Sequence, residues 1–421
     1  MHINSKTFCS APWFHLRNTN TNEYRACCLA DITKTEFIGA TKLGYPTTQP
    51  ENWVNSEYMQ YIRKELSDGN QINECSKCWQ HEKNGLPSLR HTYNNTVTNN
   101  RGNELDKTWV SLYFKNKKDY TTDLLLSVDV KLTNLCNFSC AMCNPADSSQ
   151  LYTKWQQTKK SSWIRYNLQQ TPTYLNEVRQ TFIDKQNYKL LEYAIAKHAL
   201  HIKVLGGEPL IDNKMLEMLT AMPEKQKNKT ALTFVTNGSV SLSMVCKLLG
   251  NFKHIHFTLS LEGIGKVQDW LRQGSVWKDI EKNVEEFSSV AKDNTSIGVH
   301  HTIQALSMLH IDQLVNWVSA RNISLTFCIL TNPVYLSVAL VPEDIRTIFY
   351  RKLTNLPKLI SNAYDTEDSV DVKNLSTLIN SIPVDTSAYY LLEQFLEWYD
   401  PDHNWKTVFP EWKKYLNQPV N

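Results

Sequence analysis

The sequence predicts an α/β protein built on a parallel sheet, and three observations support this fold class. Short apolar strands alternate with amphipathic helices between residues 124 and 335, and this alternation is typical of parallel βαβ units. Polar and glycine-containing motifs follow several of these strands, where active-site groups of β/α barrels gather. Hydrophobic residues make up 41% of the 421 residues, which provides for a large core and excludes an intrinsically disordered chain.

Six strands and five helices are predicted in alternating order. The strands are short apolar runs at residues 124–132, 200–205, 231–236, 254–259, 296–302 and 324–330. The helices have apolar residues at three- and four-residue spacing, at 212–221, 241–249, 277–290, 311–320 and 342–353. Residues 124–335 are therefore predicted to form one barrel domain.

Three further segments surround or interrupt this domain. Residues 1–95 form a cysteine-rich module, residues 96–123 a linker, and residues 336–421 a helical, aromatic extension that packs on the barrel. An insertion at 146–199 contains Trp155, Lys159, Lys160 and Trp163. It either touches a substrate through stacking and positive charge or packs on the barrel as amphipathic helices.

Charge and cysteine usage narrow the functional classes. Lys and Arg number 45 against 42 Asp and Glu, so the net charge of +3 lacks the basic footprint of a dedicated nucleic-acid binder. A nucleic acid stays possible as a substrate. The sequence shows neither a signal peptide nor an apolar run long enough for a membrane span, so we expect a cytoplasmic protein with no membrane partner. In such a chain, ten cysteines indicate metal binding rather than disulfides.

Three of the cysteines lie within eight residues, directly after the first predicted strand. Cys136, Cys140 and Cys143 follow the spacing C-x3-C-x2-C. Thiolates are the usual ligands of iron-sulfur clusters, and three of them would leave one iron of a 4Fe-4S cube open for chemistry. The alternative is a structural zinc site or buried free cysteines.

This spacing, with three later motifs in order, resembles the radical SAM superfamily. The motifs are Gly206-Gly207-Glu208-Pro209, Thr236-Asn237-Gly238 and Ser260-Leu261-Glu262-Gly263, each after a predicted strand. The resemblance covers about residues 124–330 and implies a partial (β/α)6 TIM-like barrel.

The resemblance also implies a set of S-adenosylmethionine (SAM) contacts. Gly206, Gly207, Glu208 and Pro209 would receive the amino group, with Thr236 and Asn237 near the ribose and methionine. Ser260 and Glu262 end the fourth strand of the barrel. Arg272 would pair with the carboxylate, or else is a solvated surface residue. Met142 stands where the family often has an aromatic residue against the adenine.

The implied activity is reductive cleavage of SAM at a 4Fe-4S cluster held by the three cysteines. An electron from a flavodoxin- or ferredoxin-type donor would produce a 5'-deoxyadenosyl radical, which abstracts hydrogen from a substrate. The expected substrate is a peptide or a small polar metabolite. The alternatives are a nucleotide or nucleic-acid modifying enzyme of this family and a non-catalytic iron-sulfur electron-transfer protein. The sequence identifies no catalytic side chain.

A second cysteine group lies before the barrel. Taken alone, Cys9, Cys27, Cys75 and Cys78 fit a structural zinc site. With Trp53, Arg63, Glu82, Gly85, Ser88 and Arg90, however, the segment resembles a twitch module, a short SPASM-type domain. That resemblance implies a second, auxiliary 4Fe-4S cluster with these four thiols as ligands, and Cys28 as the alternative to Cys27. Such modules usually follow the barrel, whereas this one precedes it.

The remaining candidate residues are expected to have structural roles. Cys246 and Cys328 lie in apolar segments and are predicted to pack in the core. The twelve histidines show no metal-binding spacing, so structural or surface roles are expected for them.

Overall fold

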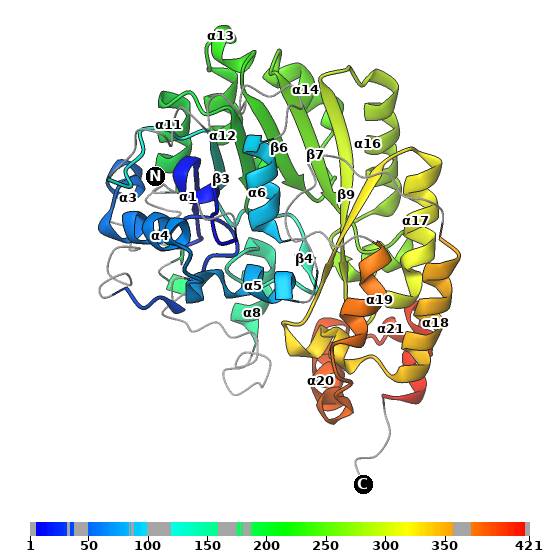
Figure 1. Cartoon of the computed structure of the whole chain (residues 1–421). Helices are drawn as coiled ribbons and strands as arrows, with labels where there is room; N and C mark the ends of the chain where they lie inside the picture. Colours follow the sequence, from blue (N-terminus) through cyan, green and yellow to red (C-terminus); the bar gives the residue numbers. More distant parts are fainter. Residues whose placement is uncertain are drawn as a thin grey trace.

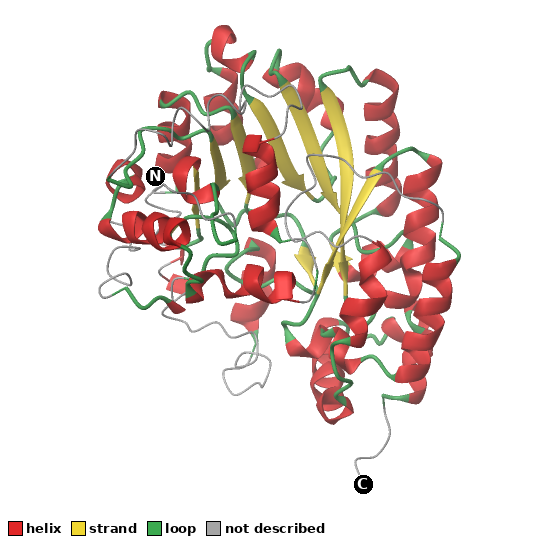
Figure 2. Ribbon diagram, in the orientation of Figure 1, coloured by secondary structure: helices red, strands yellow, loops and turns green. Residues whose placement is uncertain are grey.

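The computed structural model describes residues 6–31, 34–37, 49–83, 85, 88–98, 119–158, 175–176, 178–179, 187–356 and 372–416. Most of the predicted linker, and Lys159, Lys160 and Trp163 of the insertion, lie outside these residues. The chain is a mixed α/β structure in which one long sheet is flanked by helices (Figures 1 and 2).

All six predicted strands are confirmed, and they stand side by side in chain order. They are β3 (Ser127–Lys131), β5 (His201–Leu205), β6 (Ala231–Thr236), β7 (His254–Ser260), β9 (Thr295–Ile303) and β10 (Ser324–Ile329). Every neighbouring pair among them is parallel. All six strands therefore end at the same edge of the sheet, so the loops that follow them share one side of the molecule.

The sheet has eight strands rather than the predicted six. β1 (His15–Asn18) runs parallel to β3, with His15 opposite Ser127, and β2 (Tyr24–Arg25) pairs antiparallel with β1. The cysteine-rich N-terminal residues thus extend the sheet itself. β1 was not predicted because three of its four residues are polar, so its sequence has no alternation of polar and apolar residues.

The predicted helices are confirmed to within one residue at each end. They are α12 (Asn213–Thr220), α14 (Leu242–Leu249), α16 (Trp277–Val290), α17 (Ile311–Ala320) and α18 (Glu343–Thr354). Each buries its apolar stripe. Alternate strand residues such as Val204, Phe234 and Phe257 are fully buried in the same core.

The N-terminal residues form small helices around one buried arginine. These helices are α1 (Ala11–Phe14), α3 (Pro50–Val54), α4 (Glu57–Asp68), α5 (Ser76–Lys83) and α6 (Leu89–Thr98). Arg63 on α4 is 1% exposed and donates to the carbonyls of Pro12 (2.9 Å), Val54 (2.6 Å) and Tyr120 (2.9 Å). One guanidinium therefore ties α4 to α1, α3 and the chain that enters the barrel.

The C-terminal extension forms α19 (Val372–Asn380), α20 (Tyr389–Tyr399) and α21 (Trp405–Val408). The described part of the insertion provides α8 (Ser149–Gln157) and α11 (Tyr188–Ala196). In Figure 1 the C-terminal helices α20 and α21 lie beyond the ends of the long strands, toward α18. Among the described helices, none combines the length and apolar character needed to cross a membrane.

Candidate active site

The three predicted cluster thiols lie on one loop, residues 132–144, which we call the cysteine loop. Cys136 and Cys140 are buried and Cys143 is half-buried. Part of the loop forms β4 (Ser139–Cys140), which pairs antiparallel with β8 (Arg272–Gln273). At the start of α8, Ser149 Oγ accepts from Cys136 N at 3.1 Å, and Ser148 Oγ donates to Phe138 O at 2.6 Å. The middle of the loop is therefore tied to the start of α8 and to β8.

These thiols interact with one another in a buried environment. Burial raises the pKa of Cys140 to about 11, and it also raises the pKa values of Cys136 and Cys143. Repulsion from a Cys136 thiolate further raises the pKa of Cys140. Within the described residues, no three His, Cys, Asp or Glu side chains converge on a single ion position. Thiolates are the usual protein ligands of iron-sulfur clusters, so the chemistry of these three side chains fits such a cluster.

Gly206 and Gly207 let the end of β5 lie directly against the cysteine loop. Gly207 N donates to Thr133 O at 3.0 Å, and Glu208 N donates to Leu135 O at 2.7 Å. A Cβ atom on Gly207 would lie 2.2 Å from Leu135 O, and one on Gly206 would lie 2.6 Å from Thr133 O. Gly206 also has φ of +143°, which favours glycine. Both glycines are thus required by the approach of two backbones.

Glu208 is fully buried and serves the neighbouring strand. Its carboxylate accepts from Leu210 N (3.0 Å), Thr236 Oγ1 (2.8 Å) and Asn237 N (2.6 Å). Burial nevertheless raises the pKa of Glu208 to about 7, against the effect of these three donors. The side chain therefore joins the ends of β5 and β6, and three of its acceptor positions are already in use.

Asn237 links the end of β6 to the cysteine loop. Its Nδ2 donates to Asn137 Oδ1 at 2.9 Å, and Asn137 Nδ2 donates to Ser239 Oγ at 2.9 Å. Two motifs 100 residues apart in sequence are thus joined by side-chain amides.

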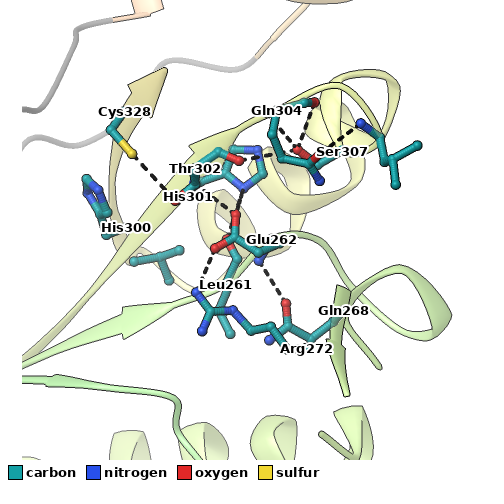
Figure 3. A network of polar contacts seen from close by, with 12 residues as sticks. Leu261, Glu262, Gln268, Arg272, His300, His301, Thr302, Gln304, Ser307 and Cys328 are labelled. Carbon is teal, nitrogen blue, oxygen red and sulfur yellow. Dashed lines mark hydrogen bonds and ion pairs between the residues drawn. The ribbon is translucent and has the colours of Figure 1, made fainter. Parts of the chain in front are cut away.

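Glu262 and Arg272 form an ion pair (Figure 3), and Arg272 also contacts one thiol of the cysteine loop. Arg272 Nη2 lies 2.6 Å from Glu262 Oε1, and its Nη1 donates to Cys140 Sγ at 3.5 Å. Glu262 Oε2 accepts from Thr302 N at 2.9 Å and lies 3.5 Å from Nδ1 of the buried His301. Arg272 Nε is buried and finds no acceptor among the described residues. This orphaned donor is what an absent anionic ligand would leave behind.

Ser260 and Met142 lie at the margins of this arrangement. Ser260 ends β7 half-buried, in register with His300 of β9. Met142 packs beside Cys136, Phe138 and Cys140. The structure therefore brings the predicted cofactor residues to one edge of the sheet, around the cysteine loop.

The four predicted auxiliary thiols form a second group. Burial raises the pKa of Cys75, and repulsion from Cys27, Cys9 and Cys78 raises it further, so these four side chains share one region. Burial likewise raises the pKa of Cys27 to about 12. Cys28 is half-buried and packs beside Cys78 and Leu29.

The polar residues predicted with this module hold its cysteine-bearing segments together. Arg90 Nη2 pairs with Glu82 Oε2 at 2.8 Å, and Ser88 Oγ donates to Glu82 Oε1 at 2.5 Å. Arg90 Nη1 also donates to Phe8 O at 2.9 Å, next to Cys9. Arg90 thereby joins the segment that carries Cys9 to helix α5, which carries Cys78.

One face of the sheet is polar, and the sequence analysis missed it. Parallel sheets are normally apolar on both faces, yet the strand registers place a mostly polar set on the face opposite the apolar core. This polar sheet face includes five of the twelve histidines, and Leu205, Ala231, Val235 and Gly298 interrupt it. Its polar members are His15, Arg17, Ser127, Asp129, Lys131, His201, Lys203, Thr233, His254, His256, Thr258, Ser260, Ser296, His300, Thr302, Ser324, Thr326 and Cys328.

Imidazole-hydroxyl pairs connect the strands across this face. His201 Nε2 lies 2.9 Å from Thr233 Oγ1, His254 Nε2 lies 2.7 Å from Ser296 Oγ, and His300 Nδ1 lies 2.9 Å from Thr326 Oγ1. Polar residues at every second position, as in His254-Ile255-His256, are the sequence signal that could have revealed it.

Comparison with known proteins gives only distant structural similarities. No protein-family model and no curated protein sequence matches the chain. Streptococcus suis SuiB is 18% identical over 54% of this chain and 45% of its own, with a TM-score of 0.34. The structure of anSMEcpe with bound AdoMet is 16% identical over 54% and 59%, with a TM-score of 0.37. TYW1 with a lysine-pyruvate adduct is 15% identical over 56% and 76%, with a TM-score of 0.32.

The chain thus spans about half the length of SuiB and of anSMEcpe.

Proposed function

We propose that this chain is a radical SAM enzyme whose reactive 4Fe-4S cluster is held by Cys136, Cys140 and Cys143. The observation that carries the proposal is the position of the cysteine loop. Its three thiols lie where the Gly206–Pro209 segment, Asn237 and the Glu262–Arg272 pair meet. When bound, the cluster and SAM supply a 5'-deoxyadenosyl radical that abstracts hydrogen from the substrate.

The residues around the loop suit a zwitterionic ligand. The buried Nε–H of Arg272, together with its charge, suits the carboxylate of SAM. Because Glu208 already accepts three hydrogen bonds from the chain, we assign the ammonium of SAM to the main chain of residues 206–209. Thr236, Asn237, Ser260, Glu262 and Met142 complete the proposed SAM site.

The polar sheet face supports a polar substrate, either a peptide or a small metabolite. It leads along the strands to the edge that carries the cysteine loop, and it offers imidazole, hydroxyl, ammonium and carboxylate groups. Such groups bind a substrate through hydrogen bonds, and this face provides no aromatic ring other than imidazole for stacking bases. Lys154 and Trp155 of the insertion are packed against neighbours, so the described residues add no support for the nucleic-acid alternative.

For the N-terminal residues, we propose an auxiliary 4Fe-4S cluster bound by Cys9, Cys27, Cys75 and Cys78 in a twitch-type module. Mutual interaction of these four thiols, of which Cys9 and Cys78 are buried, supports the assignment. Cys28 is the alternative to Cys27. A structural zinc ion is the alternative. A flavodoxin- or ferredoxin-type protein is the proposed electron donor.

Iron analysis and SAM cleavage test the whole assignment. The wild type, reconstituted without oxygen, should bind about eight irons, which is two cubes. With dithionite and SAM it should form 5'-deoxyadenosine. The Cys136→Ala, Cys140→Ala, Cys143→Ala triple variant should keep about half the iron and lose cleavage.

The matched control changes a cysteine outside both groups. Cys246→Ala, on α14, should keep the wild-type iron content and cleavage. Full iron content in the triple variant would overturn the cluster assignment. If the protein binds both clusters but calorimetry detects no SAM binding, a non-catalytic electron-transfer protein would be favoured.

A further inference from the structure

We propose that Tyr399, in the last turn of α20, is a positioning residue for the cysteine loop, so that the C-terminal extension forms part of the cofactor site. This inference rests on the proposed function. It goes beyond the proposed SAM contacts, all of which lie within the barrel.

The hydroxyl of Tyr399 lies between the two segments that carry Cys140 and Arg272. It donates to Ser139 O at 2.8 Å, and Leu271 O lies 3.2 Å away. Gln273 N, 3.4 Å from the same oxygen, donates to it. One phenol thus contacts the neighbours in sequence of both Cys140 and Arg272.

Ser139 and Cys140 form a short ladder with Gln273 and Arg272. Ser139 pairs with Gln273 and Cys140 with Arg272, which donates to the sulfur of Cys140. A two-residue ladder is too short to set its own geometry, because so few hydrogen bonds resist rotation of one segment against the other. The phenol hydroxyl, which contacts both segments, supplies the missing constraint.

Tyr399 is itself rigidly held. Its side chain is buried, its ring lies 5.0 Å from Phe395 and 5.1 Å from Trp270, and its carbonyl accepts from Lys154 Nζ and Gln273 Nε2, both at 2.9 Å. Lys154 lies on α8, directly after the cysteine loop. The contacts of Tyr399 therefore join the extension, the insertion and β8 around the loop.

Tyr399→Phe tests the inference because it removes the hydroxyl and keeps the packed ring. In the reconstituted enzyme we expect KM for SAM to rise roughly tenfold, because the hydrogen bonds to Ser139 O and from Gln273 N are lost. SAM changes the electron paramagnetic resonance spectrum of the reduced cluster at Cys136, Cys140 and Cys143, and this change should differ between Tyr399→Phe and the wild type. Iron bound by the N-terminal thiols should stay constant.

Tyr389→Phe is the matched control. Tyr389 begins the same helix, about 15 Å along the axis, and its hydroxyl has no hydrogen-bond partner among the described residues. It should leave KM and the spectrum unchanged. If Tyr399→Phe matches this control in both measurements, the inference is wrong. If the wild type itself binds no cluster or no SAM, the proposed function fails instead.

A second variant keeps the test valid if Tyr399→Phe folds poorly. Lys154→Met removes the ammonium that holds the Tyr399 carbonyl and retains the apolar stem. It should raise KM for SAM by a smaller factor in the same direction. An unchanged KM and spectrum in this variant would also count against the inference.

Discussion

Gly207→Ala is expected to expel the reactive cluster by moving the loop that binds it. The new Cβ would lie 2.2 Å from Leu135 O, next to Cys136, in a contact formed only by backbone atoms. The two backbones must separate, which breaks Gly207 N to Thr133 O and Glu208 N to Leu135 O. Two lost hydrogen bonds and the overpacking together lower the free energy of unfolding by about 4 kcal/mol.

Urea unfolding and iron analysis of reconstituted protein measure the two effects. Gly207→Ala should unfold at lower urea and lose about half of its iron, since the N-terminal group is untouched. Gly250→Ala is the control, because it strains a backbone at φ of +78° but places its Cβ in open space. It should be destabilised by only about 1 kcal/mol and keep all of its iron. Wild-type iron content in Gly207→Ala would refute the reasoning.

Three further predictions concern the rest of the chain. Arg63→Met leaves three main-chain acceptors without this donor, so the free energy of unfolding in urea should fall by about 3 kcal/mol; an unchanged midpoint would contradict this. Burial, and then His256 beside it, lowers the pKa of His254 from 6.5 to about 4. In the folded protein His254 therefore stays neutral to lower pH than in the unfolded chain, and the free energy of unfolding should decrease as the pH falls from 6.5 to 4. His254→Gln should reduce the fall of the urea midpoint between pH 6.5 and 4, whereas a substitution of the exposed His403 should leave that fall unchanged. If the urea midpoints of His254→Gln and the wild type fall in parallel with pH, this explanation is wrong. The Cys75→Ala, Cys78→Ala double variant should lose the auxiliary iron while 5'-deoxyadenosine still forms; full iron retention would return these cysteines to another role.

The sequence predicted the barrel well because its signals are local. Six strands and five helices each carry their own hydrophobic period, and the motifs lie directly after strands, where parallel topology must gather them. The residues of the motifs were identified, but their contacts were not. Glu208 was expected to face the ligand, and its carboxylate instead binds the end of β6.

The features that escaped prediction depend on contacts across long sequence separations. Tyr399 meets Ser139 across 260 residues, and no local pattern indicates such a pair. The extension was expected to pack on the barrel, and the last turn of α20 also lies against the cysteine loop. The polar sheet face could have been predicted from the sequence, because polar and apolar residues alternate along its strands. The histidines, however, were assessed only for metal-binding spacing.

The parallel pairing of β1 with β3 has a consequence for how this molecule can be divided. The N-terminal residues fill an edge of the barrel sheet, so cutting the chain between them and the barrel would expose the unpaired backbone of β3. An exposed edge strand invites association with other chains. A fragment that begins at residue 119 should therefore aggregate, and the intact chain should melt in a single transition rather than domain by domain.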